Sequence, residues 1–359
     1  MFGDFARHTA SGTPLYSALS AGIAKDDRLA GLLLQAPLAQ RQPVLLFACV
    51  HRLLLEEPDD PLARFYPNLA GIAGVDGDPV PPFRRFCHAR ARDLHELLAT
   101  RRTQTNEIGR TALLLPALAS IEREVGALVH VDVGASAGLN LLIGHYDFQY
   151  QPGGDLAIGS PVRLTCATRG VVPVPTVHPS ITVAVGVDPS PIDLDDGDQA
   201  RWLEACVWPD QVERFERLRA AIGIARRVGV DVRVGDAVHD TAPTVDLVAP
   251  SGHPVVTTSW VMNYLSPVER SDFAAALDAI GASRDLSWIY AESPALCPEL
   301  PGIPGAHGAD QPTAVVEVRW RDGRRSERHL ANAHPHGAWM HWLDDRAGAL
   351  PRRQLGTTS

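Results

Sequence analysis

The sequence predicts an α/β protein with a mainly parallel sheet, preceded by an α-helical N-terminal region. Three observations lead to this prediction. Helical periodicity dominates up to about Gly126, short β-branched runs alternate with helical segments after it, and the first such run leads into a glycine-rich turn. Alternating strands and helices are typical of a parallel sheet covered on both faces, which binds its ligands at the carboxyl ends of the strands.

The chain has 359 residues, enough for two domains of ordinary size. We expect a helical region at 1–126, an α/β core at 127–350 and a flexible tail at 351–359. In the helical region, Pro43 is placed as the first-turn proline of a helix. The other helical patterns in this region span 15–35, 83–102 and 106–125.

In the core, two segments interrupt the simple alternation of strand and helix. The segment 147–167 predicts a hairpin insertion, and 315–330 predicts a second hairpin around Asp322-Gly323, a strong turn dipeptide. The expected strands are 128–133, 181–187, 230–234, 255–260 and 287–291, and the expected helices are 139–145, 198–222 and 267–280.

Composition and charge narrow the class of protein. The net charge of -9 argues against a nucleic-acid partner, because proteins that bind the phosphate backbone usually carry a basic face. The sequence begins without a signal-peptide pattern, and no stretch approaches the ~20 apolar residues that span a bilayer. The cysteines form no C-x-x-C pair. We therefore expect a cytoplasmic protein with a small-molecule substrate, no membrane contact and no bound metal; the oligomeric state is not indicated.

The most informative segment is 129–140. An apolar strand leads into small residues at Gly134, Ser136 and Gly138, and then into a predicted helix. Small residues let a ligand approach the backbone closely, and the N-terminus of a helix offers unpaired N–H groups. The segment predicts a site for a nucleotide-like ligand, and a tight turn without a ligand is the alternative.

The spacing of the small residues distinguishes between nucleotide ligands. A G-x-G-x-x-G dinucleotide turn would need its third glycine at Leu139, and the P-loop pattern does not occur. The segment resembles the first motif of class I S-adenosylmethionine (SAM)-dependent methyltransferases, acidic-x-G-x-G-x-G, with Asp132 as the acid and Ser136 replacing the middle glycine. This resemblance implies a Rossmann-like methyltransferase core with SAM as its cofactor.

Asp188 is the predicted ribose-binding residue, because it ends the strand at 181–187 and its carboxylate can accept hydrogen bonds from ribose hydroxyls. Such an acid usually follows the glycine turn by about 20 residues. Asp188 lies much further from Gly138, and the insertion at 147–167 accounts for the excess.

Two later strand ends supply further candidates. Asp236 and Ala237 follow the strand at 230–234 and resemble the adenine-edge motif of the methyltransferases. Asn263 follows the strand at 255–260, just before a helix start that Ser266 is placed to cap.

Arg110 begins a helix that leads into the first strand. Its guanidinium suits the methionine carboxylate of SAM, whereas an ordinary surface pair with Glu107, three residues earlier, is the alternative. The predicted cofactor-binding residues are therefore Asp132, Gly134, Ser136, Gly138, Asp188, Asp236, Ala237, Asn263 and Arg110.

Over nearly its whole length the sequence also resembles a bacterial family catalogued as domain of unknown function 2332. The resemblance rests on the residues at 105–110, the Gly134 turn, Gly-Val-Asp-Pro at 186–189, and the tryptophan-containing segment 201–209. It supports the domain layout and implies no activity.

The candidates for acid–base catalysis are Glu292, His334 and His336. Glu292 ends the strand at 287–291, and the two histidines belong to the densest histidine cluster of the chain. Three interpretations of this cluster stay open. The first is a metal site, although H-E-x-x-H and a nearby cysteine are missing. The second is a packed terminal helix, and the third is a substrate-facing wall in which Trp339 and Trp342 stack on the ligand.

The glycine turn also matches the nucleophile elbow G-x-S-x-G letter for letter, with Ser136 as the nucleophile. Asp236 or Glu292, followed by His334 or His336, would complete a hydrolase triad in the order Ser, acid, His. A serine esterase is therefore the second hypothesis.

Methyl transfer from SAM to a small-molecule acceptor is the first hypothesis, because Asp132 and Asp188 have no role in a nucleophile elbow. A third hypothesis is a ligand-binding protein that keeps the fold without the activity, since a fold does not imply a function.

Overall fold

The computed structural model describes residues 1–10, 12–71, 76–302 and 313–343, and the chain divides into two compact units. The helical unit comprises Met1–Asn106 and Ile192–Gly223, and the sheet unit comprises Glu107–Pro191 and Ile224–Ser359. This division differs from the predicted boundary at 126, since the chain enters the sheet unit earlier and later returns to the helical unit. The predicted tail at 351–359 lies outside the described residues.

The helical unit is built from short helices. Pro43 occupies the first turn of its helix, as predicted, whereas three predicted helices are divided. The segment 15–35 breaks between Ile23 and Asp27, and the segment 83–102 breaks at Arg90. The segment 198–222 breaks around Pro209, because proline cannot continue a helix interior. The elements are α1 (Phe2–Thr9), α2 (Pro14–Ile23), α3 (Asp27–Gly31), η1 (Leu32–Gln35), η2 (Leu38–Gln40), α4 (Pro43–Leu54), η3 (Ala63–Phe65), α5 (Pro67–Ala70), α6 (Val80–Ala89), α7 (Ala91–Thr100), α9 (Gly197–Ala205) and the first part of α10 (Val212–Val228).

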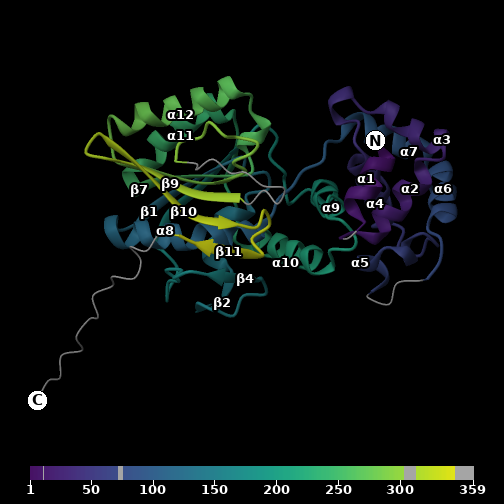
Figure 1. The fold of residues 1–359 in the computed structure, drawn as a ribbon, viewed down its shortest axis with the longest axis horizontal. Coiled ribbons are helices and arrows are strands. Elements are labelled where there is room, and N and C mark those ends of the chain that lie inside the picture. The colour runs from purple at the N-terminus through teal and green to yellow at the C-terminus, as the bar shows by residue number, and fades with distance from the viewer. Residues whose placement is uncertain (11, 72–75, 303–312, 344–359) are drawn as a thin grey trace, which may run out of the picture. The chain divides into compact units, whose positions relative to one another are not determined.

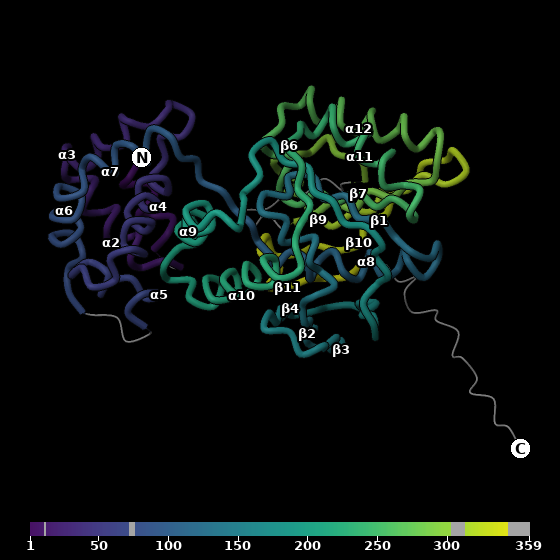
Figure 2. Tube along the Cα trace, turned by 180° about the vertical axis from the view of Figure 1, so that it is seen from behind, coloured from purple at the N-terminus to yellow at the C-terminus, as the bar shows by residue number. Residues whose placement is uncertain are grey.

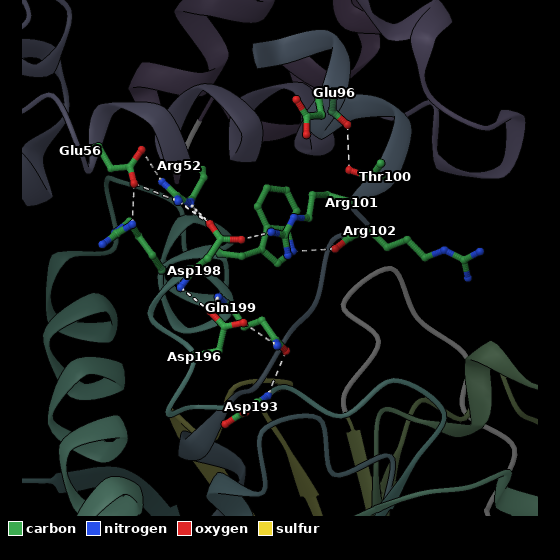
Figure 3. Close-up of polar contacts among 12 residues, drawn as sticks. Arg52, Glu56, Glu96, Thr100, Arg101, Arg102, Asp193, Asp196, Asp198 and Gln199 are labelled. Carbon is green, nitrogen blue, oxygen red and sulfur yellow. Dashed lines mark hydrogen bonds and ion pairs between the residues drawn. The ribbon is translucent and has the colours of Figure 1, made fainter. Parts of the chain in front are cut away.

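A network of charged side chains joins α9 to the N-terminal helices (Figure 3). Arg52 Nε on α4 donates to Asp198 Oδ1 on α9 over 3.2 Å, and Arg101 also binds the Asp198 carboxylate. Trp202 lies in the same apolar core as the N-terminal helices, and its Nε1 donates to the carbonyl of Arg102 over 2.9 Å. These contacts explain why a segment from the middle of the chain belongs to the helical unit.

The sheet unit contains one mixed sheet. Within the described residues it has eleven strands in the order β3-β2-β4-β11-β10-β9-β8-β7-β1-β5-β6. In Figure 2, β6 and the β2–β3 pair lie at opposite ends of this sheet. The strands are β1 (Leu128–Val133), β2 (Asp147–Gln151), β3 (Gly154–Leu156), β4 (Arg163–Arg169), β5 (Ile181–Asp188), β6 (Val232–Val234), β7 (His253–Ser259), β8 (Leu286–Glu292), β9 (Thr313–Arg321), β10 (Arg324–Ala333) and β11 (Trp339–Trp342).

The predicted strands of the core form the parallel part of the sheet, in the order β6-β5-β1-β7-β8. The chain places β5 and β6 on one side of β1 and then β7 and β8 on the other. Such a reversal of strand order is the point at which doubly wound sheets bind ligands.

Helices cover both faces of the sheet (Figure 1). α11 (Ala237–Val248) and α12 (Pro267–Gly281) pack on the face that carries Val131, Trp288 and Val316. α8 (Thr111–Val125) covers the opposite face. None of the described helices combines the length and the apolar character that crossing a membrane requires.

Three core elements differ from the prediction. The segment 139–145 is a 3-10 helix, η5 (Leu139–His145), with a non-helical residue at Leu142, and not a regular α-helix. The segment 147–167 is not a single hairpin: β2 pairs antiparallel with β3, and β4 pairs parallel with β2 on its other side. α11 was not expected, because Pro243 lies inside it.

The second predicted hairpin is present as β9 and β10. Asp322 and Gly323 join the strands, and both have the positive φ that the favoured two-residue hairpin turns require. The adjacent β11 pairs antiparallel with β10 and parallel with β4, so it joins the inserted strands to the rest of the sheet.

The end of α12 supplies a test of packing between helix and sheet. A Cβ atom on Gly281 would lie 2.1 Å from Trp320 Cγ, and Trp320 is a buried residue of β9. We expect Gly281→Ala to lower the free energy of unfolding by about 1–3 kcal/mol, because the added methyl group overpacks this contact. Urea unfolding followed by tryptophan fluorescence measures the change.

Gly144→Ala is the matched control, because its added Cβ meets no atom within 4 Å and Gly144 belongs to the same unit. Its effect should stay within about 0.5 kcal/mol. Equal losses in the two variants would contradict the packing account.

Candidate functional site

The carboxyl ends of the five parallel strands lie at one edge of the sheet. The register pairs Val133 of β1 with Val187 of β5 and with Thr258 of β7. It also pairs Asp188 with Val234 of β6. Residues that follow these strands therefore gather at this edge, which is where the sequence placed the ligand.

The turn after β1 has an unusual backbone conformation. Gly134, Ser136 and Gly138 all have positive φ, at 75°, 53° and 72°. A Cβ atom on Gly134 would lie 2.4 Å from Val261 Cγ2, and one on Gly138 would lie 2.7 Å from Val232 Cγ2. Both glycines are therefore required by packing and by their positive φ. Ser136 is the residue of this turn that adopts a positive φ in spite of its side chain.

Asp188 lies against this turn. Its Oδ2 accepts a hydrogen bond from the backbone N–H of Ser136 over 2.8 Å, and its Oδ1 accepts one from Ser190 N–H over 2.8 Å. The structure thus brings together the predicted ribose-binding acid and the predicted turn, although they are far apart along the chain. Each carboxylate oxygen already has one donor, and each has a further lone pair for a ligand hydroxyl.

Asp132 is buried within β1 and bonds to partners that the sequence did not reveal. Thr257 Oγ1 of β7 donates to Asp132 Oδ1 over 2.6 Å, and Nε2 of His130 lies 2.8 Å from the same hydroxyl. Burial raises the pKa of Asp132 to about 7, and the hydrogen bonds from Thr257 and Asn140 oppose this increase. Burial also lowers the pKa of His130 to about 4, so this histidine is neutral.

Glu292 ends β8 and is fully buried, with 0% of its surface exposed. Its Oε1 accepts a hydrogen bond from Val261 N–H over 3.0 Å. Burial raises the pKa of Glu292 to about 7, while backbone hydrogen bonds from Val261 and Met262 favour the ionised form. The structure therefore places this candidate base at the predicted edge, but beneath the surface.

Arg110 is buried and binds two backbone carbonyls. Its Nη1 donates to Ser259 O at the end of β7, and its Nε donates to Pro335 O, each over 2.9 Å. Its guanidinium carbon also lies 5.8 Å from the centre of the Trp260 ring. The expected alternative of a solvated surface pair does not hold, since Arg110 and Glu107 are both buried. The predicted role of Arg110 in holding a ligand carboxylate stays a prediction.

His334 and His336 lie in the turn between β10 and β11. The terminal helix that was one interpretation of this cluster does not form, because the residues after the turn are the strand β11. His336 Nδ1 lies 3.1 Å from Glu107 Oε2, and the backbone N–H of His336 donates to His334 Nδ1 over 3.1 Å. Of the two tryptophans expected to stack on a ligand, Trp339 is 40% exposed and Trp342 is buried.

The remaining predicted residues lie at the same edge of the sheet. Asp236 caps α11 by accepting from Val238 N–H over 2.8 Å, and Ala237 is the first residue of that helix. Asn263 lies in the short helix η7 (Met262–Tyr264) after β7. The side-chain oxygens of Asn263 and Asn140 are buried and have no hydrogen-bond partner among the described residues.

The acids proposed for a hydrolase triad bind other groups. Asp236 Oδ1 lies 2.9 Å from His239 Nδ1, and Glu292 binds the backbone after β7. In the part of the chain that is described, no three histidine, cysteine or carboxylate side chains are placed to hold a metal ion. The metal site therefore has no support among these residues, and a wall facing the substrate stays a prediction.

Sequence reasoning missed the roles of four residues of this edge. Glu107 entered only as a partner for Arg110, and His130, Asn140 and Thr257 were not considered. Strand alternation was the available signal for His130, since residues two apart on a strand share a face and Asp132 was already a candidate. No local pattern indicates that Thr257 lies opposite Asp132 or that Glu107 meets His336.

The structure defines a mixed α/β protein with a large, mostly parallel sheet and a polar edge at the reversal of strand order. The chain belongs to the family described as "Uncharacterized protein conserved in bacteria (DUF2332)", whose model matches residues 1–342. No match was found among curated proteins or among solved structures.

The buried carboxylate of Asp132 predicts a pH dependence of stability. Its pKa of about 7 in the folded state lies above the value of about 3.9 in an unfolded chain. Its contribution to the free energy of unfolding is thus fully present below pH ~4 and is lost as the pH rises through about 7. Each pKa unit corresponds to about 1.4 kcal/mol.

Asp132→Asn cannot ionise, so its free energy of unfolding should fall less than that of the wild type between pH 5 and pH 8. Urea unfolding at these two pH values measures the difference. Glu292→Gln should act in the same direction, because the pKa of Glu292 is also raised to about 7. If the free energy of unfolding of both variants falls with pH as steeply as that of the wild type, these carboxylates do not cause the pH dependence.

Proposed function

We propose that the protein binds SAM at the turn 134–138 and transfers its methyl group to a small-molecule acceptor. The observation that carries this proposal is the contact of Asp188 with Ser136 N–H at the reversal of strand order. It joins an acid at the end of β5 to a turn of small residues after β1. A ribose hydroxyl that approached this turn would reach the remaining lone pairs of the Asp188 carboxylate.

The donor and acceptor groups of this edge fit SAM. The side-chain oxygens of Asn140 and Asn263 are buried and accept no hydrogen bond from the described residues. They suit a ligand that carries N–H donors. The ammonium group and the adenine amine of SAM are donors of this kind. The carboxylates of Asp132 and Glu292 also favour a cationic ligand over an anionic one.

The short η5 helix also bears on the choice of ligand. A phosphate group is held at the N-terminus of a regular helix, where several N–H groups and the helix dipole act together. η5 has 7 residues with a non-helical residue inside, so it offers no such site. This favours a cofactor without phosphate, and SAM has none.

In this proposal SAM supplies a methyl group on a sulfonium sulfur, and the residues of the chain bind it, orient it and keep water away. Asp188 would hold the ribose, Asp236 and Ala237 would lie beside the adenine edge, and Asn263 would accept from a ligand N–H. Methyl transfer depends on in-line placement of the reactants, which such positioning provides.

A serine esterase remains the second candidate, because Ser136 has a positive φ of 53° within a G-x-S-x-G turn. A strained turn of this kind exposes the nucleophile of α/β-hydrolases. Against it, Asp236 and Glu292 bind groups other than His334 and His336. A ligand-binding protein without catalytic activity is the third candidate, and it would bind SAM without turnover.

Calorimetric titration with SAM and with S-adenosylhomocysteine, its demethylated product, tests the cofactor. We expect both to bind, and Asp188→Asn to weaken binding by about 10- to 100-fold, because a hydrogen bond to a charged group is lost. Asp155→Asn is the control, since Asp155 is an exposed residue of β3 at the far end of the sheet. Failure of wild-type protein to bind either compound at high micromolar concentration would exclude a SAM site.

Ser136→Ala separates the two enzyme hypotheses. Alanine is also small, so a SAM site should keep its affinity within about threefold, whereas an esterase should lose its hydrolysis of p-nitrophenyl acetate by at least about 1,000-fold. Measuring SAM affinity and ester hydrolysis in the wild type and in Ser136→Ala distinguishes the methyltransferase from the esterase. The esterase would be favoured if the wild type binds no SAM and hydrolyses the ester, and if Ser136→Ala loses this hydrolysis.

A further inference from the structure

Glu107 and His336 form a carboxylate–imidazole pair at the turn between β10 and β11. The Oε2 atom of Glu107 lies 3.1 Å from His336 Nδ1. The Glu107 side chain is 1% exposed, whereas that of His336 is 43% exposed. A buried carboxylate thus lies beside one ring nitrogen of an imidazole that reaches the surface.

A hydrogen bond and close backbone contacts hold the segment of Glu107 against the turn of His336. Glu107 Oε1 accepts from Gly109 N–H over 3.0 Å, and Glu107 Oε2 lies at ion-pair distance from His336 Nδ1. A Cβ atom on Gly109 would lie 2.4 Å from His336 O, and one on Gly337 would lie 2.0 Å from Gly109 O. The two segments therefore touch through their backbones, at positions where only glycine fits.

Further hydrogen bonds fix the turn relative to the edge of the sheet. Arg110 donates to Pro335 O, next to His336, and to Ser259 O at the end of β7. The backbone N–H of His336 donates to His334 Nδ1 over 3.1 Å. Arg110 thus links the backbone of this turn to the end of β7, the strand that neighbours β1 and its glycine turn.

The nearby carboxylate of Glu107 also favours one tautomer of a neutral His336. A carboxylate this close to Nδ1 favours the tautomer with its proton on Nδ1, which leaves the lone pair on Nε2. A carboxylate that orients a histidine in this way is the arrangement that makes imidazole an effective general base. Glu292, another of the candidate bases, is 0% exposed and lies beneath the surface.

We propose that His336 Nε2 accepts the proton of the methyl acceptor, with Glu107 as the positioning residue; this rests on the proposed function. The acceptor is then a hydroxyl or an ammonium compound. Its oxygen or nitrogen gives its proton to Nε2 and its electron pair to the methyl carbon. The carbon–sulfur bond breaks, its electron pair stays on sulfur, and the imidazolium formed is balanced by Glu107.

The tautomer of His336 gives a test that needs no turnover. In protein labelled with 15N-histidine, long-range 1H–15N correlation spectra distinguish the two tautomers, and His336→Asn assigns the signals. We expect wild-type His336 to carry its proton on Nδ1. Wild-type protein with the proton on Nε2 would overturn the proposal.

Glu107→Gln makes the test sharper. The Gln oxygen must still accept from Gly109 N–H, so its amide group turns its N–H donors toward His336 Nδ1. We expect the neutral ring to change to the tautomer with the proton on Nε2, which removes the basic lone pair. An unchanged tautomer in this variant would show that Glu107 does not orient the ring.

Formation of S-adenosylhomocysteine from SAM, with catechol and tyramine as probe acceptors, tests the catalytic step. His336→Asn keeps an N–H donor for Glu107 but lacks Nε2, so kcat should fall by about 100-fold or more while calorimetric SAM affinity stays unchanged. Glu107→Gln should lower kcat in the same direction. His95→Asn, at an exposed histidine of α7, is the control and should keep wild-type kcat.

Full turnover in His336→Asn would overturn the role of His336. SAM binding without wild-type turnover of either probe would overturn the proposed acceptor class. If the protein has the expected tautomer but does not bind SAM, the proposed function and the methyl-transfer step are both overturned. The orientation of His336 by Glu107 would still stand in that case.

Discussion

The hydrogen bonds of the Arg110 guanidinium connect the main parts of the candidate site. They join the carbonyl of Ser259, at the end of the parallel strand β7, to the carbonyl of Pro335 in the turn after β10. Loss of this side chain would leave two carbonyls without these donors, which is costly for buried groups. Arg110 therefore determines how the histidine turn lies against the strand ends, and its charge favours ionisation of Asp132 and Glu292.

The two buried carboxylates lie on opposite faces of the same sheet. Val131 and Trp288 pack beneath α11 and α12, so strand alternation places Asp132 on the other face and Glu292 on the same face as these helices. Burial raises the pKa of both to about 7. The edge thus carries acids whose charge responds to a nearby cation, a property suited to a sulfonium or ammonium ligand.

Features that depend on neighbouring residues were predicted well. The strands of the parallel part follow from β-branched runs, and the β9–β10 hairpin follows from Asp322-Gly323. α11 was missed because Pro243 interrupts its pattern, although Asp236 provides a side-chain cap at its start. The pairing of β4 with β2 was wrong, since the alternation of a strand defines its buried face but does not specify which strand lies beside it.

The sequence by itself determined the positions of most strands, the turn at 134–138 and the acids that follow the strands, because these depend on local periodicity and on the conformations that small residues allow. Only the tertiary structure decided that Asp188 meets Ser136, that Thr257 meets Asp132 and that Glu107 meets His336. Each of these contacts joins segments far apart along the chain. Sheet pairing and burial create them, so no local pattern in the sequence encodes them.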